Sequence, residues 1–226
     1  MDRYGPEGAL APRGIDERRC PASRARRIDR TDPEVGYGAR HRPVTFAELV
    51  ADIVARLDAV GIPHMVTGSI ASSWYGEPRA TQDLDVVIDP PADGLERLVE
   101  GLQADGWYVD RDVALAALRD RTQFNAIDPD SFKVDFIVRH DRPFSSGEFD
   151  RRRPAQLLGV NTYLPTLEDM VIAKLEWAQA SDSDRQLRDV IGMLDVAGGE
   201  IDSTYIDGWA ERLGIERAWE RVRNGR

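Results

Sequence analysis

Apolar residues recur along most of this chain with the spacing of helices or strands. The first sustained pattern begins at Thr45, which has capping-box spacing with Glu48 and precedes a helical apolar face that ends before Gly61. Short β-branched or apolar runs then alternate with helical patterns. Strands are predicted over 63–67, 84–88, 107–109, 122–127 and 131–138, and helices over 70–75, 94–104 and 113–118. This order predicts an α/β (α+β) fold with a mixed sheet of four or five strands and helices on one side.

The chain changes character after this sheet. Residues 140–159 are polar, which predicts a boundary between two parts of the chain. A last short strand is predicted over 160–164, and a helix is predicted to begin at Thr166. Further helices are predicted over 184–196, 203–213 and 215–223. We therefore expect a core over 43–145 and a mainly helical C-terminal subdomain over 146–226. The five tryptophans, at 74, 107, 177, 209 and 219, are expected to pack in the core.

Residues 1–42 are rich in Arg, Gly and Pro and show no sustained apolar periodicity, which predicts a disordered extension. A basic arm for an anionic partner is the functional alternative. The chain has one cysteine, Cys20, and no apolar run of membrane-spanning length. The N-terminus also lacks the apolar segment of a signal peptide. These features predict a cytoplasmic protein without a membrane partner.

Charge is distributed unevenly along the sequence. The formal net charge is -10, yet residues 1–42 hold ten Arg and seven acidic residues, which leaves 20 basic and 33 acidic residues in the remainder. Such an acidic body offers no broad surface for nucleic acid. The triplet from Arg151 to Arg153 is the one local candidate for an RNA contact, and a solvated loop is its alternative.

The stretch from Gly61 to Asp89 carries the first candidate chemistry. Gly68 permits a sharp turn, Ser69 adds a hydroxyl, and the following short helix presents free N–H groups, a combination that suits a phosphate. Asp83 and Asp85 alternate on the next strand, so their carboxylates share one face and attract a cation.

A third carboxylate follows in the strand predicted over 131–138. Asp135 is the one acid in this otherwise apolar run, where an isolated carboxylate is costly unless it is paired or bound to metal. Phosphates together with carboxylates indicate Mg²⁺, which takes oxygen ligands from both protein and substrate. Asp83, Asp85 and Asp135 are therefore the predicted metal ligands.

Gly68-Ser69, the Asp83-Leu-Asp85 motif and the later Asp135 resemble the active site of the DNA polymerase β-type nucleotidyltransferase superfamily. The segment GSIASSWYGEPRATQDLD is most similar to the AbiEii/AbiGii toxin branch. By this resemblance Gly68 and Ser69 hold the triphosphate. Arg79, in the Arg-x-Thr of the motif, either steadies a phosphate or braces the loop.

The resemblance extends into the helical part and covers residues 45–215. Leu-Pro-x-x-Glu-Asp at 164–169, Lys174, and the Arg-Asp pair at 188–189 match segments of the same branch. The resemblance implies that Lys174 binds the nucleotide's phosphates and that Asp189 orients this lysine or assists catalysis; an interhelical surface salt bridge is the alternative. Lys133 and Lys174 are the only lysines among 30 basic residues, which hints at a need for a compact charge.

The activity that this resemblance implies is transfer of an NMP from an NTP to an acceptor hydroxyl, with two Mg²⁺ ions, or Mn²⁺, held by the three aspartates. The toxin branch implies the 3′ end of tRNA as acceptor and a cognate antitoxin as partner. Other branches of the superfamily modify proteins or small antibiotics. A catalytically silent nucleotidyltransferase fold that only binds a partner is a further alternative.

Overall fold

A computed structural model describes residues 45–225, which belong to one compact unit. The extension predicted over 1–42 lies outside the described residues. In chain order the elements are α1 (Phe46–Ala59), β1 (His64–Val66), α2 (Gly68–Tyr75), β2 (Asp83–Ile88), α3 (Ala92–Ala104), β3 (Tyr108–Val109), α4 (Arg111–Asp120), β4 (Gln123–Ile127), β5 (Lys133–Val138), α5 (Pro143–Asp150), β6 (Arg153–Leu157), β7 (Val160–Leu164), α6 (Leu167–Ser181), α7 (Asp184–Ala197), α8 (Ser203–Leu213) and α9 (Glu216–Asn224).

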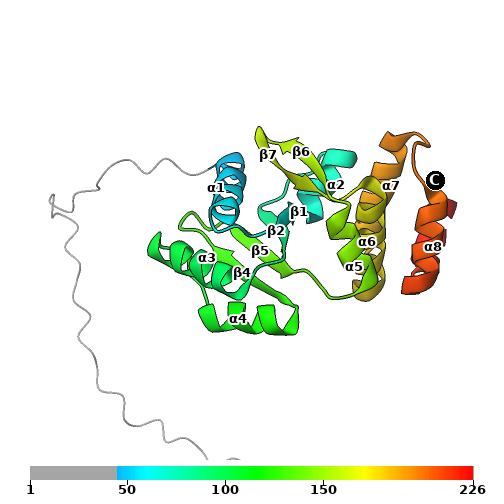
Figure 1. The fold of residues 1–226 in the computed structure, drawn as a ribbon. Helices are drawn as coiled ribbons and strands as arrows, with labels where there is room; N and C mark the ends of the chain where they lie inside the picture. The colour runs from blue at the N-terminus through cyan, green and yellow to red at the C-terminus, as the bar shows by residue number, and fades with distance from the viewer. Residues whose placement is uncertain (1–44, 226) are drawn as a thin grey trace, which may run out of the picture. The chain divides into compact units, whose positions relative to one another are not determined.

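The first five strands form one mixed sheet in the order β1-β2-β5-β4-β3. β2 and β5 are parallel, and the other neighbouring pairs are antiparallel. Figure 1 shows α3 and α4 beside this sheet and α6, α7 and α8 grouped in the C-terminal part of the chain. The predicted mixed α/β fold is confirmed. The division into a core and a subdomain at residue 145 stays a prediction.

Side chains alternate along β2 and β5 between a buried face and a more open face. The buried face consists of Leu84, Val86, Ile88, Val134, Phe136 and Val138, all inaccessible to solvent. Apolar residues of α1, α3 and α4 belong to the same core, so these helices stabilise this face. The intervening residues, which include all three predicted aspartates, point to the opposite face.

The stretch 140–159, predicted as a polar boundary, instead forms α5 and the first strand of the β6-β7 hairpin. Pro143 occupies the first turn of α5, where a missing N–H is tolerated. Phe144 and Phe149 are buried and anchor this helix. Helix α5 was not predicted, because burial of two aromatic rings outweighs a local sequence that has little helical periodicity.

Two arginines of the 151–153 triplet contact other residues of the chain, so a solvated loop does not describe them, and the RNA contact stays a prediction. Arg151 donates to both carboxylate oxygens of Asp169, at 2.7 and 3.1 Å, and contacts the hydroxyl of Tyr205. Asp169 is fully buried and therefore requires a partner for its charge. The Arg152 guanidinium lies 4.2 Å from the ring centroid of Phe149.

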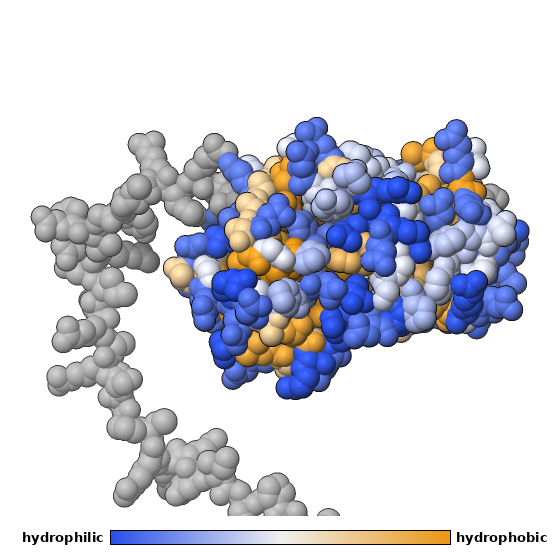
Figure 2. Space-filling model, viewed as in Figure 1, coloured by the Kyte–Doolittle hydropathy of each residue, from blue (hydrophilic) through white to orange (hydrophobic). Residues whose placement is uncertain are grey.

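The surface of residues 45–225 is mixed in character. Hydrophilic side chains predominate on the face drawn in Figure 2, with smaller apolar areas between them. Trp107 and Trp219 are buried as predicted, but Trp74 and Trp177 are 49% and 55% exposed, so core packing is the wrong prediction for this second pair. Over the described part of the chain, no helix combines the length and the apolar character needed to cross a membrane.

The Asp169 cluster leads to a stability prediction. Asp169→Ala removes the anion that Arg151 and Tyr205 contact, and we expect it to lower the free energy of unfolding by about 2–3 kcal/mol, less than for a fully buried pair because Arg151 is partly exposed. Urea denaturation measures the change. As a control, Glu220→Ala on the exposed side of α9 should stay within about 0.5 kcal/mol of the parent. Equal losses in the two variants would contradict the structural role of Asp169.

Candidate functional site

The three predicted aspartates lie on neighbouring strands at the open face of the sheet. In the register of β2 and β5, Asp85 stands opposite Asp135, and Asp83 stands opposite Lys133. Asp83 is exposed, whereas Asp85 and Asp135 are partly buried. Strand alternation and the parallel register together bring these carboxylates to one place.

The turn at Gly68 is built against Asp85. Gly68 has a φ of +64°, which glycine adopts without strain, and it opens α2. A Cβ at this position would lie 1.8 Å from Asp85 Oδ2, so the close approach requires glycine. The Ser69 backbone N–H donates to the Asp85 carboxylate, and the Thr67 N–H donates to the Asp85 carbonyl oxygen at 2.9 Å. The predicted phosphate-binding turn and the first carboxylates therefore form one unit.

Lys174 and Asp189 form a buried contact beside this turn. Lys174 Nζ lies 2.8 Å from Asp189 Oδ2, and the two side chains are only 4% and 12% exposed. They come from α6 and α7, which pack against each other. The two residues form an interhelical ion pair, as the alternative expected, but it is buried rather than at the surface, and their roles in a site stay a prediction.

Arg79 enters from the loop between α2 and β2 and connects the turn to this contact. Its Nη2 donates to the Ser69 hydroxyl and lies 3.6 Å from Asp189 Oδ2, which braces the loop. Its Nε and Nη1 are buried and have no hydrogen-bond partner. Unpaired buried donors cost free energy, which an acceptor such as a phosphate oxygen would offset.

Lys133 is a site residue that was not selected from the sequence. Its Nζ lies 2.8 Å from Asp135 Oδ2, and its hydrogen bond to that carboxylate raises the pKa of Lys133. Two signals pointed to it, namely the scarcity of lysine and its position two residues before Asp135 on one strand face. Both lysines of the chain thus lie at this site.

Burial raises the pKa of Asp85, and the neighbouring charge of Asp135 raises it further. Within residues 45–225, no group of three histidine, cysteine or acidic side chains is assembled as a preformed metal site. The donors that Asp83, Asp85 and Asp135 present are nevertheless all carboxylate oxygens, which suit Mg²⁺ or Mn²⁺. A divalent cation would also relieve the repulsion at Asp85, so the donor set fits such an ion.

A cavity of about 220 Å³ joins these elements. The Gly68 turn, Asp85 and Asp135 line it from the sheet side, and Lys174 lines it from α6. Gln123, Gln186 and Trp177 also line this cavity, and sequence reasoning did not select them because residue type alone does not show which face they occupy. Asp83, Arg79 and Asp189 are not among the lining residues, and Arg79 and Asp189 line a different cavity with Arg185 and Arg188.

Comparisons with known proteins show which solved structures this chain resembles. No protein-family model matches the chain, and no curated protein sequence matches it significantly. The crystal structure of ANT(2")-Ia in complex with adenylyl-2"-tobramycin has a TM-score of 0.50 at 16% identity, over 80% of this chain and 99% of that one. The lincomycin-bound lincosamide antibiotic adenylyltransferase LnuA has a TM-score of 0.48 at 12% identity, over 69% and 99% of the two chains. An antigenic nucleotidyltransferase-like protein from Paracoccidioides brasiliensis has a TM-score of 0.46 at 16% identity, over 66% and 75%.

The protein therefore has a nucleotidyltransferase-type fold, a conclusion that rests on the likeness to ANT(2")-Ia. The expected fold class is confirmed by it. Identity at this level establishes the fold alone, so the AbiEii/AbiGii branch stays a prediction.

The raised pKa of Asp85 leads to a prediction about stability and pH. A carboxyl group that holds its proton more tightly when folded destabilises the folded state once it ionises, and this cost vanishes at low pH, where both states are protonated. We expect Asp85→Asn to raise the melting temperature of the nucleotide-free protein by a few degrees at pH 7 and to lose this advantage toward pH 4. Calorimetry across this range tests the expectation, with Glu100→Gln on α3 as an exposed control. A lower melting temperature for Asp85→Asn at pH 7 would show that ionised Asp85 is stabilising.

Proposed function

We propose that this protein is a Mg²⁺-dependent nucleotidyltransferase that moves an NMP from an NTP to an acceptor hydroxyl. The observation that carries this proposal is the buried contact between Lys174 and Asp189 beside the Gly68 turn. This contact fixes the ammonium group of Lys174 on one wall of a cavity, and Asp85 and Asp135 line the opposite wall. Opposed walls of donors and carboxylates are what positioning and charge stabilisation in phosphoryl-type transfer require.

The phosphate side of the proposed site is formed by the turn, Arg79 and Lys174. Gly68 and Ser69 place the triphosphate at the start of α2, where the helix dipole favours an anion. The two unpaired N–H groups of Arg79 donate to phosphate oxygens. Lys174, oriented by Asp189, neutralises charge that develops on the leaving pyrophosphate.

The acceptor side is formed by the carboxylates. Asp83, Asp85 and Asp135 would hold the Mg²⁺ or Mn²⁺ ions, two by analogy with the superfamily. When bound, the ions supply charge neutralisation at the α-phosphate and make the acceptor hydroxyl more acidic. Asp135, the carboxylate nearest the acceptor by the same analogy, takes the hydroxyl proton. The acceptor oxygen bonds to the α-phosphorus as the bond to the bridging oxygen breaks, and pyrophosphate leaves.

The role of Lys174 is tested by Lys174→Met, which keeps the apolar stem and removes the ammonium. We expect affinity for Mg²⁺-NTP to fall about 10- to 100-fold, because a charged hydrogen bond contributes about 1.5–3 kcal/mol. Calorimetric titration with each of the four NTPs measures this, and thermal melting verifies folding. The control Arg97→Met, an exposed residue of α3, should bind as the parent does. An unaltered dissociation constant for Lys174→Met would refute the role.

Two acceptors come into consideration for the same chemistry. The toxin-like resemblance favours the 3′ end of tRNA, with a cognate antitoxin as regulator. A small molecule is favoured by one observation in this chain, a second cavity that shares a wall with the first. The antibiotics named with ANT(2")-Ia and LnuA agree with such an acceptor but belong to those proteins.

Label transfer tests the activity directly. With Mg²⁺ and α-³²P-labelled NTPs, the parent protein should label total tRNA, a protein band or a small-molecule fraction of bacterial lysate, and Asp83→Asn should label none of them. The fraction that carries the label identifies the acceptor class. Absence of label in every fraction, together with intact NTP binding, would favour the catalytically silent fold over the enzyme.

A further inference from the structure

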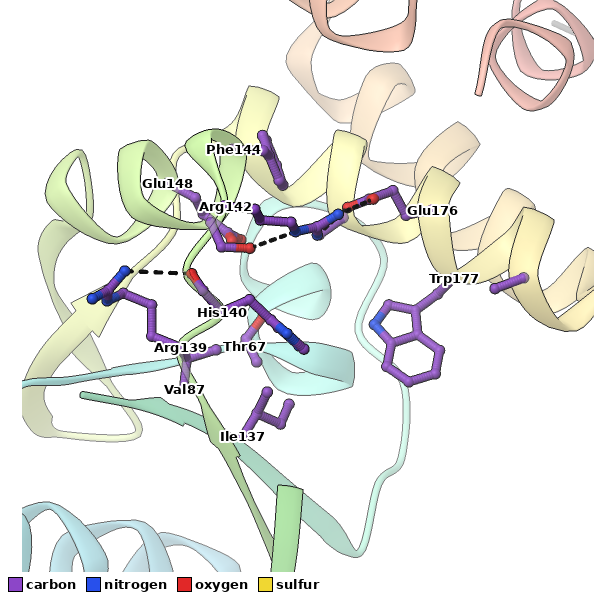
Figure 3. A pocket seen from close by; sticks show the side chains of 13 residues that line it. Thr67, Val87, Ile137, Arg139, His140, Arg142, Phe144, Glu148, Glu176 and Trp177 are labelled. Carbon is purple, nitrogen blue, oxygen red and sulfur yellow. Dashed lines mark hydrogen bonds and ion pairs between the residues drawn. The ribbon is translucent and has the colours of Figure 1, made fainter. Parts of the chain in front are cut away.

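A second cavity adjoins the candidate site and is not used by the proposed chemistry. It measures about 290 Å³, close to the lower limit for small-molecule sites, and lies between the ends of β2 and β5 and helices α5 and α6. Figure 3 shows Phe144 and Glu148 from α5, and Glu176 and Trp177 from α6, around this cavity.

The two cavities share part of their lining. Thr67, Ile137, Ala173 and Trp177 contribute to both. Ile137 lies two residues after Asp135 on the same face of β5, so the shared wall begins where the candidate site ends. A molecule in the second cavity therefore lies next to the place where the reaction would occur, which is where an acceptor must be held.

The guanidinium groups of this second cavity are already engaged. Arg142 donates to both carboxylate oxygens of Glu176, at 2.6 and 2.7 Å. Arg139 donates to Asp89 at 3.0 Å and to the Ser146 hydroxyl at 2.8 Å. Neither arginine offers the free charge that a phosphate ligand would need.

Glu148 differs from the other charged residues of the cavity. It is 8% exposed, and within residues 45–225 no hydrogen bond or ion pair engages its carboxyl group. Burial, followed by the charges of Asp169 and Glu176, raises the pKa of Glu148 to about 8. Burial and the charge of Arg142 lower the pKa of His140, which keeps that ring neutral at pH 7. The cavity thus contains one unpaired carboxyl group and no unpaired cation.

Trp177 supplies the second recognition element. Its side chain is 55% exposed, whereas Met170, Val171, Ile172 and Leu175 of the same helix are buried, and it lines both cavities. Phe144 and Ile137 are further apolar residues that line this cavity. An exposed indole and a buried carboxyl group together favour a cation with an apolar body, because the ring attracts the cation and the carboxylate neutralises it.

We propose that this second cavity binds the acceptor of the transfer reaction, a small molecule with a protonated amine beside apolar surface, and that Glu148 is the counter-charge of the amine. The acceptor role of this molecule rests on the proposed function. Binding of an amine in this cavity does not depend on that function and is tested separately. A tRNA end fits less well, because its phosphates would approach an unpaired acid and arginines that are already engaged.

Binding is tested on the full chain with phenethylamine as the probe and phenethyl alcohol as its neutral counterpart. At pH 8.5, where a carboxyl group with a pKa of about 8 is mostly ionised, calorimetry should show at least tenfold tighter binding of the amine. Glu148→Gln, which keeps the shape of the side chain, should abolish this preference, whereas Glu100→Gln, on an exposed part of α3, should retain it. Equal affinity for the two probes, or a preference that survives in Glu148→Gln, overturns the proposal.

The pH dependence of amine binding provides a readout that a merely structural role would not change. The charged groups that act on Glu148 are Arg142 and Arg151, which oppose the rise of its pKa, and Asp169 and Glu176, which promote it. The amine binds the ionised carboxylate, and an aliphatic ammonium stays protonated to about pH 10. Affinity should therefore rise about tenfold from pH 7 to pH 8.5, given the pKa of about 8. A flat profile in the parent protein contradicts the role of Glu148.

Label transfer separates this inference from the proposed function. Label on a small amine fraction that is lost in Glu148→Gln, whose NTP binding is retained, supports both. Label on tRNA that is unaffected by Glu148→Gln overturns the acceptor cavity and leaves the nucleotidyltransferase proposal standing. Amine binding without label on any acceptor overturns the acceptor role while supporting the amine site.

Discussion

Two carboxylates on adjacent parallel strands set the conditions around the site. The register of β2 and β5 places Asp85 beside Asp135, and burial makes ionisation of Asp85 costly. Positive partners offset this cost from three directions: the Ser69 N–H at the start of α2, Lys133 on β5, and Lys174 on α6, whose charge lowers the pKa of Asp85. The turn, the sheet and the C-terminal helices therefore all act on the charge of Asp85. A divalent cation bound there would offset the rest of the cost of ionising this carboxyl group.

The use of lysine and arginine follows the geometry that each position needs. Both lysines approach carboxylates at the site as compact charges. Arginine contacts two oxygens of one carboxylate in the pairs of Arg142 with Glu176 and Arg151 with Asp169. In a chain with 30 basic residues, the retention of lysine at these two positions is consistent with a site that needs point charges rather than planar forks.

Sequence patterns predicted those parts of the molecule that depend on local periodicity. The apolar face of α1 and the alternation in β2 and β5 were readable because one face of each element is buried, and the alternation also placed Asp83 with Asp85. Helix α5 was missed because burial of Phe144 and Phe149 is a tertiary effect. Trp177 was assigned to the core for a related reason, since an aromatic residue type does not reveal whether it meets packed side chains or a cavity.

The two adjacent cavities differ in their charged groups, and this difference bears on selectivity. The first is lined by Asp85, Asp135 and Lys174, so a triphosphate there depends on the cation that the carboxylates would hold and on the ammonium of Lys174. The second has its arginines engaged and Glu148 unpaired. It offers no free cation to a phosphate, while its carboxylate, once ionised, attracts an amine. Because the cavities share Ile137 and Trp177, these preferences would hold the two reactants on either side of one wall, in the relative positions that transfer between them requires.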